Sequence, residues 1–524
     1  MASLNWIGKQ AVVNHDKEVP FKLLKKIKSA SVGTSQNLIV HGDNLEALKA
    51  LMPYYVGKIK CIYIDPPYNT GNEGWVYNDK VNSPKIRQWL GKVVGHESED
   101  LTRHDKWLCM MYPRLKLLRD LLTDNGVIFV SIDDNEHCNL RGAMDEIFGE
   151  KNFIGSFIWK NKLGGGNDSS VLVTEHEFIA VYAKNVDEIK KFTEKNVDNG
   201  KYLYEDEYVN TRGKFSIEAL YRSSIQYSES LFYPIKAPDG TFIYPNESDK
   251  NSKKHIWRWS KGTYEKKLKE GRVLLKKTKN GWRVFSKQYF NEDDEGNPRV
   301  LSMRSIIDFI GNRQGTEMLK GLFNDDKVFN NPKPVPLIKK LIEISTDADS
   351  VILDSFAGSG TTGHAVLDLN KEDGGNRKFI LVEMEDKVAK DITAERVKRA
   401  IKKYDYKDGF EYCELDKPLF SEHGQIEETC DFKQFATYIY FTETQTNIDH
   451  AKVKANYIGE QNGTEYYLVY KEPHKNDLDK SFLKKLEKTD SKKIVYADRC
   501  TLDESELAEY NVVFKQIPYE VKVY

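Results

Sequence analysis

The chain has 524 residues, and its 79 lysines and arginines nearly balance 80 aspartates and glutamates, for a formal net charge of −1. This length is typical of two to four domains, and the spread of aromatic and β-branched residues excludes a mainly disordered protein. No apolar run approaches the ~18–20 residues of a membrane span, and the N-terminus lacks the apolar core of a secretory signal. We therefore expect a cytoplasmic protein whose six cysteines are free thiols.

Charge is strongly segregated along the chain. Residues 250–290 carry 14 basic and 2 acidic side chains, a net charge of +12. Residues 404–524 carry 16 basic and 24 acidic side chains, a net charge of −8. Such segregation often accompanies polyanion binding by one part of a chain, so the neutral total does not exclude a nucleic-acid partner.

Short apolar runs alternate with helical patterns through most of the sequence. In the first part of the chain we predict helices over 45–52 and 112–122, and strands over 37–41, 60–64, 126–132 and 178–182. Further along, strands over 350–353 and 379–382 enclose a helix that begins near Thr361. This alternation predicts an α/β fold with a parallel sheet.

Two regions depart from this alternation. Residues from about 185 to 325 are rich in charged, aromatic, Asn and Gly residues, which indicates an inserted domain. Residues 404–524 mix strand and helix patterns and predict a small C-terminal α/β domain. Because this last segment is acidic, we expect it to contact protein rather than phosphate.

The first candidate site is Asp65-Pro66-Pro67-Tyr68, directly after the strand KCIYI. In open α/β sheets, ligands bind at the carboxyl ends of strands. The two prolines fix φ and remove two N–H donors, so the turn presents the Asp65 carboxylate and the Pro66 carbonyl as acceptors beside the flat face of Tyr68. That set suits the exocyclic amino group of a stacked base, and we take these four residues as catalytic.

The second candidate site is a glycine-rich turn, DSFAGSGTTG, between a strand and a helix. Glycines allow close backbone approach to a ligand, and a helix N-terminus adds free N–H groups. The spacing Gly358-x-Gly360-x-x-Gly363, with Glu383 twenty residues on, matches a dinucleotide fingerprint. By itself this pattern supports a nicotinamide-dependent oxidoreductase as well as an enzyme that uses S-adenosyl-L-methionine (SAM).

The two motifs together resemble the β-class amino-methyltransferases of DNA, and most closely the Mod subunits of type III restriction–modification systems. The matching segments are HGDNLEALKAL, IKCIYIDPPYNTG, DNGVIFVSIDDNE, MDEIFGEKNF, TEHEFIAVYAKN, NPKPVPLIKKLI, ILDSFAGSGTTGHAV and GGNRKFILVE. They cover about half the chain, in the order of the β-class, with the catalytic motif ahead of the SAM motif.

The resemblance implies a permuted, Rossmann-like SAM-dependent methyltransferase sheet. The strands ending at Asp354 and Glu383 would be first and second in the unpermuted order, and those ending at Asp43 and Asp65 third and fourth. The implied domains are two methyltransferase parts, 1–185 and 328–403, a target-recognition insert over 186–327, and the C-terminal domain over 404–524.

The resemblance also assigns the cofactor site. The implied SAM-binding residues are Asp43, Asp354, Phe356, Gly358, Gly360, Thr361 and Glu383. Asp43 would contact the adenine of SAM, but it could equally cap the helix that follows it. The implied activity is methyl transfer to N6 of adenine in double-stranded DNA, because aspartate begins the catalytic tetrad; base flipping would be required. No metal site is expected.

The basic block supplies candidate DNA contacts within the insert. Its lysines and arginines alternate with aromatic residues, and such a surface can bind phosphates and stack on bases. The candidate DNA-binding residues are Lys253, Lys254, Arg258, Lys261, Lys276, Lys277 and Arg283. A solvated basic face over core aromatics is the alternative, and core packing is the more natural role of Trp257 and Trp259.

Several partners follow from the resemblance. A Mod subunit implies a homodimer and a separate restriction (Res) subunit, since the chain shows no GxxxxGK[ST] nucleotide-binding loop of its own. A stand-alone adenine methyltransferase and a non-catalytic DNA-recognition subunit are the alternatives. No membrane partner is expected.

Overall fold

The structure is a computed structural model. It describes residues 4–70, 91, 102–164, 171–196, 200–223, 227–245, 254–325, 328–420, 426–427, 429–471 and 475–517. The chain forms two compact units: unit 1 is Met1–Lys190 with Arg304–Tyr524, and unit 2 is Lys191–Met303. The insert expected over 186–327 extends beyond unit 2 on both sides.

Unit 1 is built on a ten-stranded sheet. Its strands, in spatial order, are β1 (Lys22–Lys26), β19 (Glu411–Pro418), β2 (Leu38–His41), β18 (Lys378–Glu383), β17 (Val351–Asp354), β3 (Ile59–Ile64), β4 (Leu122–Ile132), β6 (His176–Ala183), β5 (Phe153–Lys160) and β16 (Ile306–Ile307). The strands from β19 to β4 are mutually parallel, whereas β1 and β6 pair antiparallel with their neighbours.

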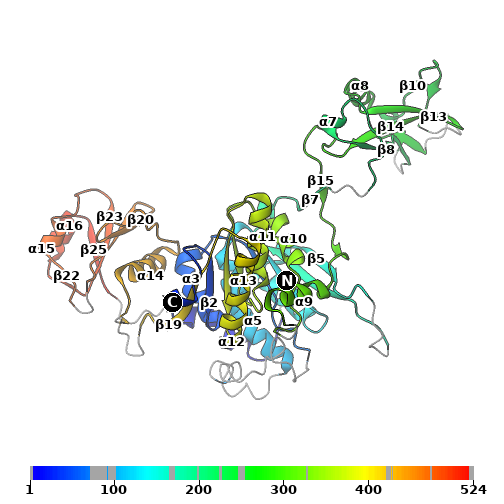
Figure 1. Ribbon diagram of the computed structural model, residues 1–524. Coiled ribbons are helices and arrows are strands. Elements are labelled where there is room, and N and C mark those ends of the chain that lie inside the picture. Colours follow the sequence, from blue (N-terminus) through cyan, green and yellow to red (C-terminus); the bar gives the residue numbers. More distant parts are fainter. Residues whose placement is uncertain are drawn as a thin grey trace. The chain divides into compact units, whose positions relative to one another are not determined.

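The strand order β2-β18-β17-β3-β4 confirms the predicted permutation. The strand ending at Asp354 lies between the strands ending at Glu383 and Asp65. Numbered as in an unpermuted chain, the five strands β2, β18, β17, β3 and β4 are the third, second, first, fourth and fifth. In Figure 1 the blue β2 accordingly lies in one sheet with strands from the yellow part of the chain, more than 300 residues away in sequence. The parallel register brings the carboxyl ends of these strands to one edge of the sheet.

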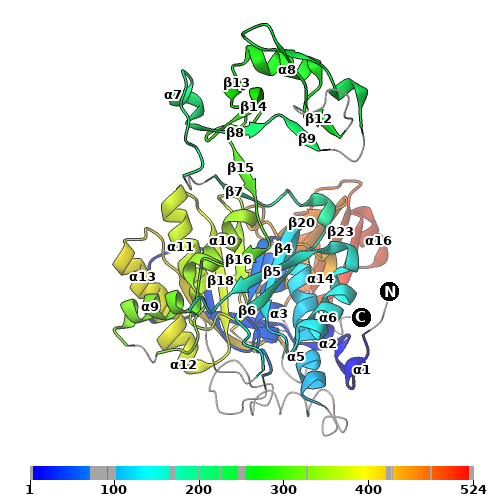
Figure 2. The ribbon, with the colours of Figure 1, turned by 90° about the vertical axis from the view of Figure 1, so that its right-hand side faces the viewer.

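Helices cover both faces of this sheet. One group consists of α1 (Lys9–Val12), α2 (His15–Glu18), α3 (Asn44–Tyr55), α5 (Arg103–Leu121) and α6 (His137–Phe148). The other group consists of α9 (Asn312–Phe323), α10 (Val335–Ser345), α11 (Thr361–Asp373), α12 (Asp386–Val388), the π-helical turn η6 (Ala389–Ala394) and α13 (Glu395–Tyr404). Figure 2 shows α5 and α6 to the right of the sheet and α11 and α13 to the left.

The main core lies between the sheet and the first helix group. Trp107 and Leu118 of α5 and Ile128 of β4 are completely buried there. The central strands β3, β17 and β18 are apolar on most residues, as expected for strands covered on both faces. Among the described residues, no helix combines the length and apolar composition that crossing a bilayer requires.

The C-terminal part of unit 1 adds a second, smaller sheet. Its strand order is β20 (Tyr457–Gln461), β21 (Thr464–Leu468), β23 (Lys492–Ala497) and β25 (Val512–Gln516). The other elements are α14 (Phe432–Thr444), α15 (Lys480–Leu483), α16 (Glu504–Glu509) and the pair β22 (Asp477–Leu478) and β24 (Arg499–Cys500). Part of the predicted 404–524 domain belongs to the large sheet, because β19 pairs with β2.

Unit 2 is a small, mainly β structure. Its three-stranded sheet has the order β13 (Val273–Thr278), β14 (Gly281–Tyr289) and β8 (Phe215–Ala219). Three short pairs of strands are also described: β7 (Thr193–Lys195) with β15 (Val300–Ser302), β9 (Tyr221–Ser223) with β12 (His255–Trp257), and β10 (Ile235–Lys236) with β11 (Phe242–Ile243). Its described helices are α7 (Val209–Arg212) and α8 (Lys261–Lys269). Trp257 is buried in the core of this unit, as predicted.

Phe129 offers a test of the sheet core. It is completely buried in β4 and faces Tyr63 of β3 and Val181 of β6 across the ladder. We expect Phe129→Ala to lower the free energy of unfolding by about 3–5 kcal/mol, because it leaves a cavity in the sheet core. Thermal unfolding measures this, with Ile306→Ala as the control, since Ile306 is exposed on the last strand. Equal melting temperatures for the two variants would contradict this packing.

Candidate active site

The two sequence motifs meet at the carboxyl edge of the large sheet. Asp354 ends β17 and Asp65 follows β3, the neighbouring parallel strand. A small hollow at this point is lined by Asp65, by residues of 329–333 and by residues of the turn 354–362. Chain connections leave β17 and β3 for opposite parts of the sheet, and such switch points are where open α/β sheets bind ligands.

Asp65 is almost buried and is paired with Lys333. The Lys333 Nζ lies 2.9 Å from each carboxylate oxygen of Asp65 and donates its hydrogen bond to Oδ2. Burial raises the pKa of Asp65, and Lys333 opposes this increase while Glu177 adds to it. The anions of Asp65 and Glu177 outweigh the effect of burial on Lys333, so its pKa is raised and its ammonium stays charged. The sequence analysis assigned Lys333 no contact.

Tyr68 is held from behind by a second carboxylate. Its hydroxyl donates a hydrogen bond of 2.9 Å to Glu177 on β6, and Asn161 Nδ2 donates one of 2.7 Å to the other oxygen of Glu177. Trp107 donates its indole N–H to the Pro67 carbonyl at 2.7 Å. These bonds fix the turn and the tyrosine ring relative to the sheet, so that the face of Tyr68 is preorganised.

The glycine-rich turn wraps its own acidic residue. Asp354 accepts the backbone N–H of Phe356 at 3.0 Å and the hydroxyl of Thr362 at 2.5 Å. Burial raises the pKa of Asp354 to about 7, against the lowering effect of these two hydrogen bonds. Gly360 has φ of +77°, a conformation that favours glycine, and a Cβ there would lie 3.0 Å from the Thr393 carbonyl oxygen.

Glu383 lies where the sequence predicts it, at the end of β18, and it is buried. One carboxylate oxygen accepts the Gly358 N–H at 2.9 Å and the other accepts the Glu385 N–H at 2.9 Å. The acid predicted to bind a ribose therefore also fastens the glycine-rich turn to the neighbouring strand.

For Asp43 the capping alternative is realised. Its Oδ1 accepts the N–H groups of Leu45 and Glu46 at 2.9 and 3.2 Å and caps α3. Its Oδ2 accepts a hydrogen bond of 3.2 Å from the buried Arg114. The side chain is about one-third exposed, so a ligand contact remains a separate prediction for this residue.

Arg396 supports the same turn from inside the protein. It is completely buried, and its Nη1 donates to the Ser359 and Thr361 hydroxyl oxygens at 2.7 Å each. Within the described residues, its Nε and Nη2 have no hydrogen-bond partner. A positive charge thus lies directly behind residues 359–361. Sequence patterns did not single out Arg396, because an arginine in a charged helix normally faces solvent.

Comparison with known proteins identifies the family of the chain. Residues 59–395 match the family model described as DNA methylase. The chain belongs to the DNA methylase family. It is 30% identical over 501 residues to the EcoP15I Mod subunit of a type III restriction–modification enzyme from Escherichia coli, covering 84% of this chain and 75% of that subunit.

Two further relatives come from different kinds of restriction–modification system. The StyLTI Mod subunit of a type III enzyme from Salmonella typhimurium is 35% identical over 372 residues, or 69% of this methylase, which spans only 54% of that subunit's length. The type II methyltransferase M.KpnI from Klebsiella pneumoniae is 33% identical over 374 residues, which cover 68% of this chain and 82% of that enzyme. The methylase is thus similar to members of both kinds of system.

SAM is the methyl donor of this family, and the observed groups suit it. The buried Asp354 offers a carboxylate to an ammonium group, Glu383 offers carboxylate oxygens to ribose hydroxyls, and the turn before α11 offers free backbone N–H groups. The observation that supports this fit is the absence of a side chain at Gly358, which lines the hollow together with Asp354.

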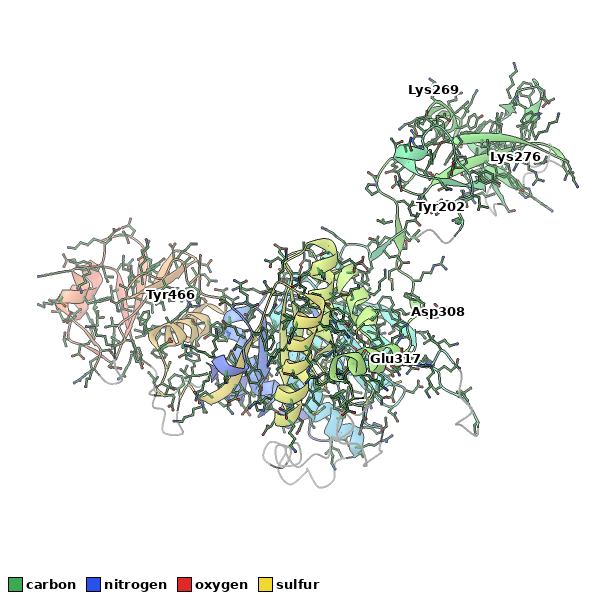
Figure 3. All side chains as sticks on the ribbon, viewed as in Figure 1. Tyr202, Lys269, Lys276, Asp308, Glu317 and Tyr466 are labelled. Atoms are coloured by element: carbon green, nitrogen blue, oxygen red, sulfur yellow. The ribbon has the colours of Figure 1, made fainter. Side chains whose placement is uncertain are left out.

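The predicted DNA-binding residues all belong to unit 2. Lys254, Arg258, Lys261, Lys276 and Lys277 are exposed, Arg283 is half-buried, and Lys253 lies outside the described residues. Figure 3 shows Lys269 on α8 and Lys276 on β13 with their side chains on the surface of this unit.

Part of the basic block forms ion pairs within unit 2. Lys267, Arg272 and Lys287 are buried, and they pair with Glu270, Glu292 and Asp206 respectively. The +12 charge of the sequence therefore overstates the charge available to an external partner.

The ionisation of Asp354 gives a prediction for SAM binding. Since burial raises the pKa of Asp354 to about 7, and only the ionised carboxylate attracts an ammonium, we expect SAM affinity to be full above this pKa and to fall as pH drops through it. Calorimetric titration between about pH 6 and pH 8 measures the change. Asp354→Asn should bind SAM more weakly and without this pH dependence; a variant with the wild-type pH profile would contradict the assignment.

Proposed function

We propose that the methylase transfers the methyl group of SAM to N6 of adenine in double-stranded DNA, at a specific sequence and after base flipping. The observation that carries the proposal is that Asp65, beside the face of Tyr68, shares one hollow with the glycine-rich turn at Asp354. An acceptor for an amino group and a site for the methyl donor thus lie within reach of each other.

The residues of the turn supply the chemistry of nitrogen activation. The N6 lone pair of adenine is delocalised into the ring and is a poor nucleophile. Hydrogen bonds from the amino group to Asp65 and to the Pro66 carbonyl favour a tetrahedral nitrogen whose lone pair can attack. Stacking on Tyr68 orients the base, and this positioning lowers the barrier. SAM, when bound, supplies an electrophilic methyl group on a positively charged sulfur.

Aspartate at the first position of the tetrad favours adenine over cytosine. Among the β-class enzymes that the chain resembles, those that methylate N4 of cytosine more often carry serine at this position. The carboxylate of Asp65 is a stronger acceptor for an amino group than a hydroxyl is. Methylation of C5 of cytosine requires a cysteine nucleophile, and Cys61, the cysteine nearest in sequence, is buried within β3.

We propose the role of a Mod subunit of a type III restriction–modification system for the whole protein. Similarity to the EcoP15I and StyLTI Mod subunits supports this role, which includes a homodimer and a Res partner. A stand-alone methyltransferase is the second candidate, because M.KpnI is covered over 82% of its length. Light scattering of the purified protein tests the dimer, and co-purification with a Res chain encoded beside it tests the partner.

Asp65 is the direct test of the reaction. Incubation with labelled SAM and duplex DNA should place label in adenine, and sequencing of methylated bases from an expressing host should identify the target. We expect Asp65→Ala to reduce the rate by at least ~10²-fold, since it removes an acceptor that acts on the attacking nitrogen, while SAM binding is retained.

Asp124→Ala is the matched control, because Asp124 is exposed at the opposite end of β4. Full activity of Asp65→Ala would refute the mechanism, and label in cytosine would refute the choice of base.

Adjacent lysines on β13 test the DNA surface of unit 2. Strand alternation points Lys276 and Lys277 to opposite faces, and Lys277 shares its face with the core residues Leu275 and Trp282. We propose that the Lys276 face binds phosphate. Lys276→Gln should then reduce the slope of log K against log salt by about 1, and Lys277→Gln should leave it unchanged. Equal slopes for both variants would contradict this choice of face.

A further inference from the structure

Lys333 is a nearly buried cation that lines the hollow of the site. It precedes α10, is 9% exposed, and its Nζ lies 2.9 Å from both oxygens of Asp65. The same nitrogen lies 5.0 Å from the ring centroid of Tyr68 and 5.8 Å from that of Trp159. No other described side chain donates a hydrogen bond to the Asp65 carboxylate through a nitrogen.

These contacts are the ones that the target amino group requires. In the proposed reaction, N6 of adenine donates to Asp65 while its base lies over Tyr68. The Lys333 ammonium already donates to Asp65 and already lies over Tyr68. Within the described residues Asp65 Oδ1 accepts no hydrogen bond, but the Lys333 Nζ lies 2.9 Å from it as well. A second nitrogen donor on this side of the carboxylate therefore competes with the ammonium for space.

We infer that Lys333 is a built-in occupant of the substrate-amine position, displaced from Asp65 towards Glu177 when the target adenine enters. The inference rests on the proposed function and assigns Lys333 and Glu177 as positioning residues for it. In the DNA-free protein the ammonium compensates the buried charge of Asp65, and in the complex the amino group of the base replaces it as hydrogen-bond donor.

Glu177 provides the second position for the ammonium. Its Oε2 already lies 3.4 Å from the Lys333 Nζ and accepts the Tyr68 hydroxyl at 2.9 Å. Its Oε1 is held by Asn161 Nδ2 at 2.7 Å. A short movement therefore keeps the ammonium paired with a carboxylate, while Asp65 accepts a hydrogen bond from the neutral amino group of the base.

The exchange also leaves a proton acceptor where the reaction needs one. Formation of the N6–methyl bond breaks the methyl–sulfur bond and leaves a positive charge on N6, which must lose one proton. With Lys333 on Glu177, the Asp65 carboxylate is free to accept that proton. Lys333 stays protonated throughout and balances Glu177.

The test compares Lys333→Met with wild type on an unmethylated duplex that contains the protein's target sequence. The titratable groups that act on Lys333 are Asp65, on the turn after β3, and Glu177 of β6. Tyr68 lies beneath its ammonium, and Tyr63 of β3 and Asp354 of β17 line the same hollow. Removing the ammonium leaves Asp65 without its counter-charge, so the acidic limb of kcat/KM should move up by about one pH unit or more. Above that limb, the KM for DNA should fall about 3–10-fold with kcat retained, because no occupant has to be displaced.

Lys339→Met is the matched control. Lys339 lies on α10 and pairs with Asp368 and Glu372 outside the site, so its loss removes an ion pair of similar kind without changing the pH profile or KM. The inference is overturned if Lys333→Met keeps the wild-type acidic limb, if its KM for DNA stays the same or rises, or if kcat is lost at every pH.

Lys333→Arg decides the question if the methionine variant does not fold. A guanidinium keeps the positive charge but binds a carboxylate through two hydrogen bonds and releases it less readily. We expect an unchanged acidic limb with a KM for DNA raised several-fold; an unchanged KM overturns the inference. Absence of adenine methylation by the wild type would instead refute the proposed function, so the two failures are distinguishable.

Discussion

The buried ion pair between Asp65 and Lys333 is the interaction around which the site of this methylase is organised. A carboxylate with so little exposure is costly unless a cation and hydrogen bonds compensate it. Lys333 supplies the cation at 2.9 Å, and Glu177 holds the same ammonium from the other side at 3.4 Å. Three elements far apart in sequence must therefore meet for the charge of Asp65 to be tolerated.

The sheet order is what makes that meeting possible. Inserting β17 and β18 between β2 and β3 places the ends of β17 and β3 side by side. The glycine-rich turn is then fastened by hydrogen bonds to two other elements. Gly358 donates to Glu383 of β18, and Arg396 of α13 donates to Ser359 and Thr361. Close packing at Gly360 leaves no room for a side chain. The proposed donor site and the proposed amino-group acceptor are thus positioned by the same set of strand ends.

Much of this arrangement follows from the sequence. The strands ending at Asp65, Asp354 and Glu383 have apolar runs that stop at the acidic residue, and the structure confirms both their positions and their permuted order. For the basic block, the sequence gives the net charge but does not show which side chains form ion pairs inside the protein. Lys267, Arg272 and Lys287 are paired inside unit 2 and cannot be distinguished by pattern from exposed neighbours such as Lys276.

The sequence by itself determined the fold class and the residues of the two motifs, because these depend on local patterns of polarity, proline and glycine. The permuted strand order was implied by the family resemblance of those motifs. Only the tertiary structure decided the partners of those residues: that Asp43 caps α3, that Glu177 supports Tyr68, and that Lys333 pairs with Asp65 across 268 positions of sequence. Burial and pairing depend on which segments the fold brings together. The sequence does not distinguish a lysine that is exposed to solvent from one that is buried beside a carboxylate.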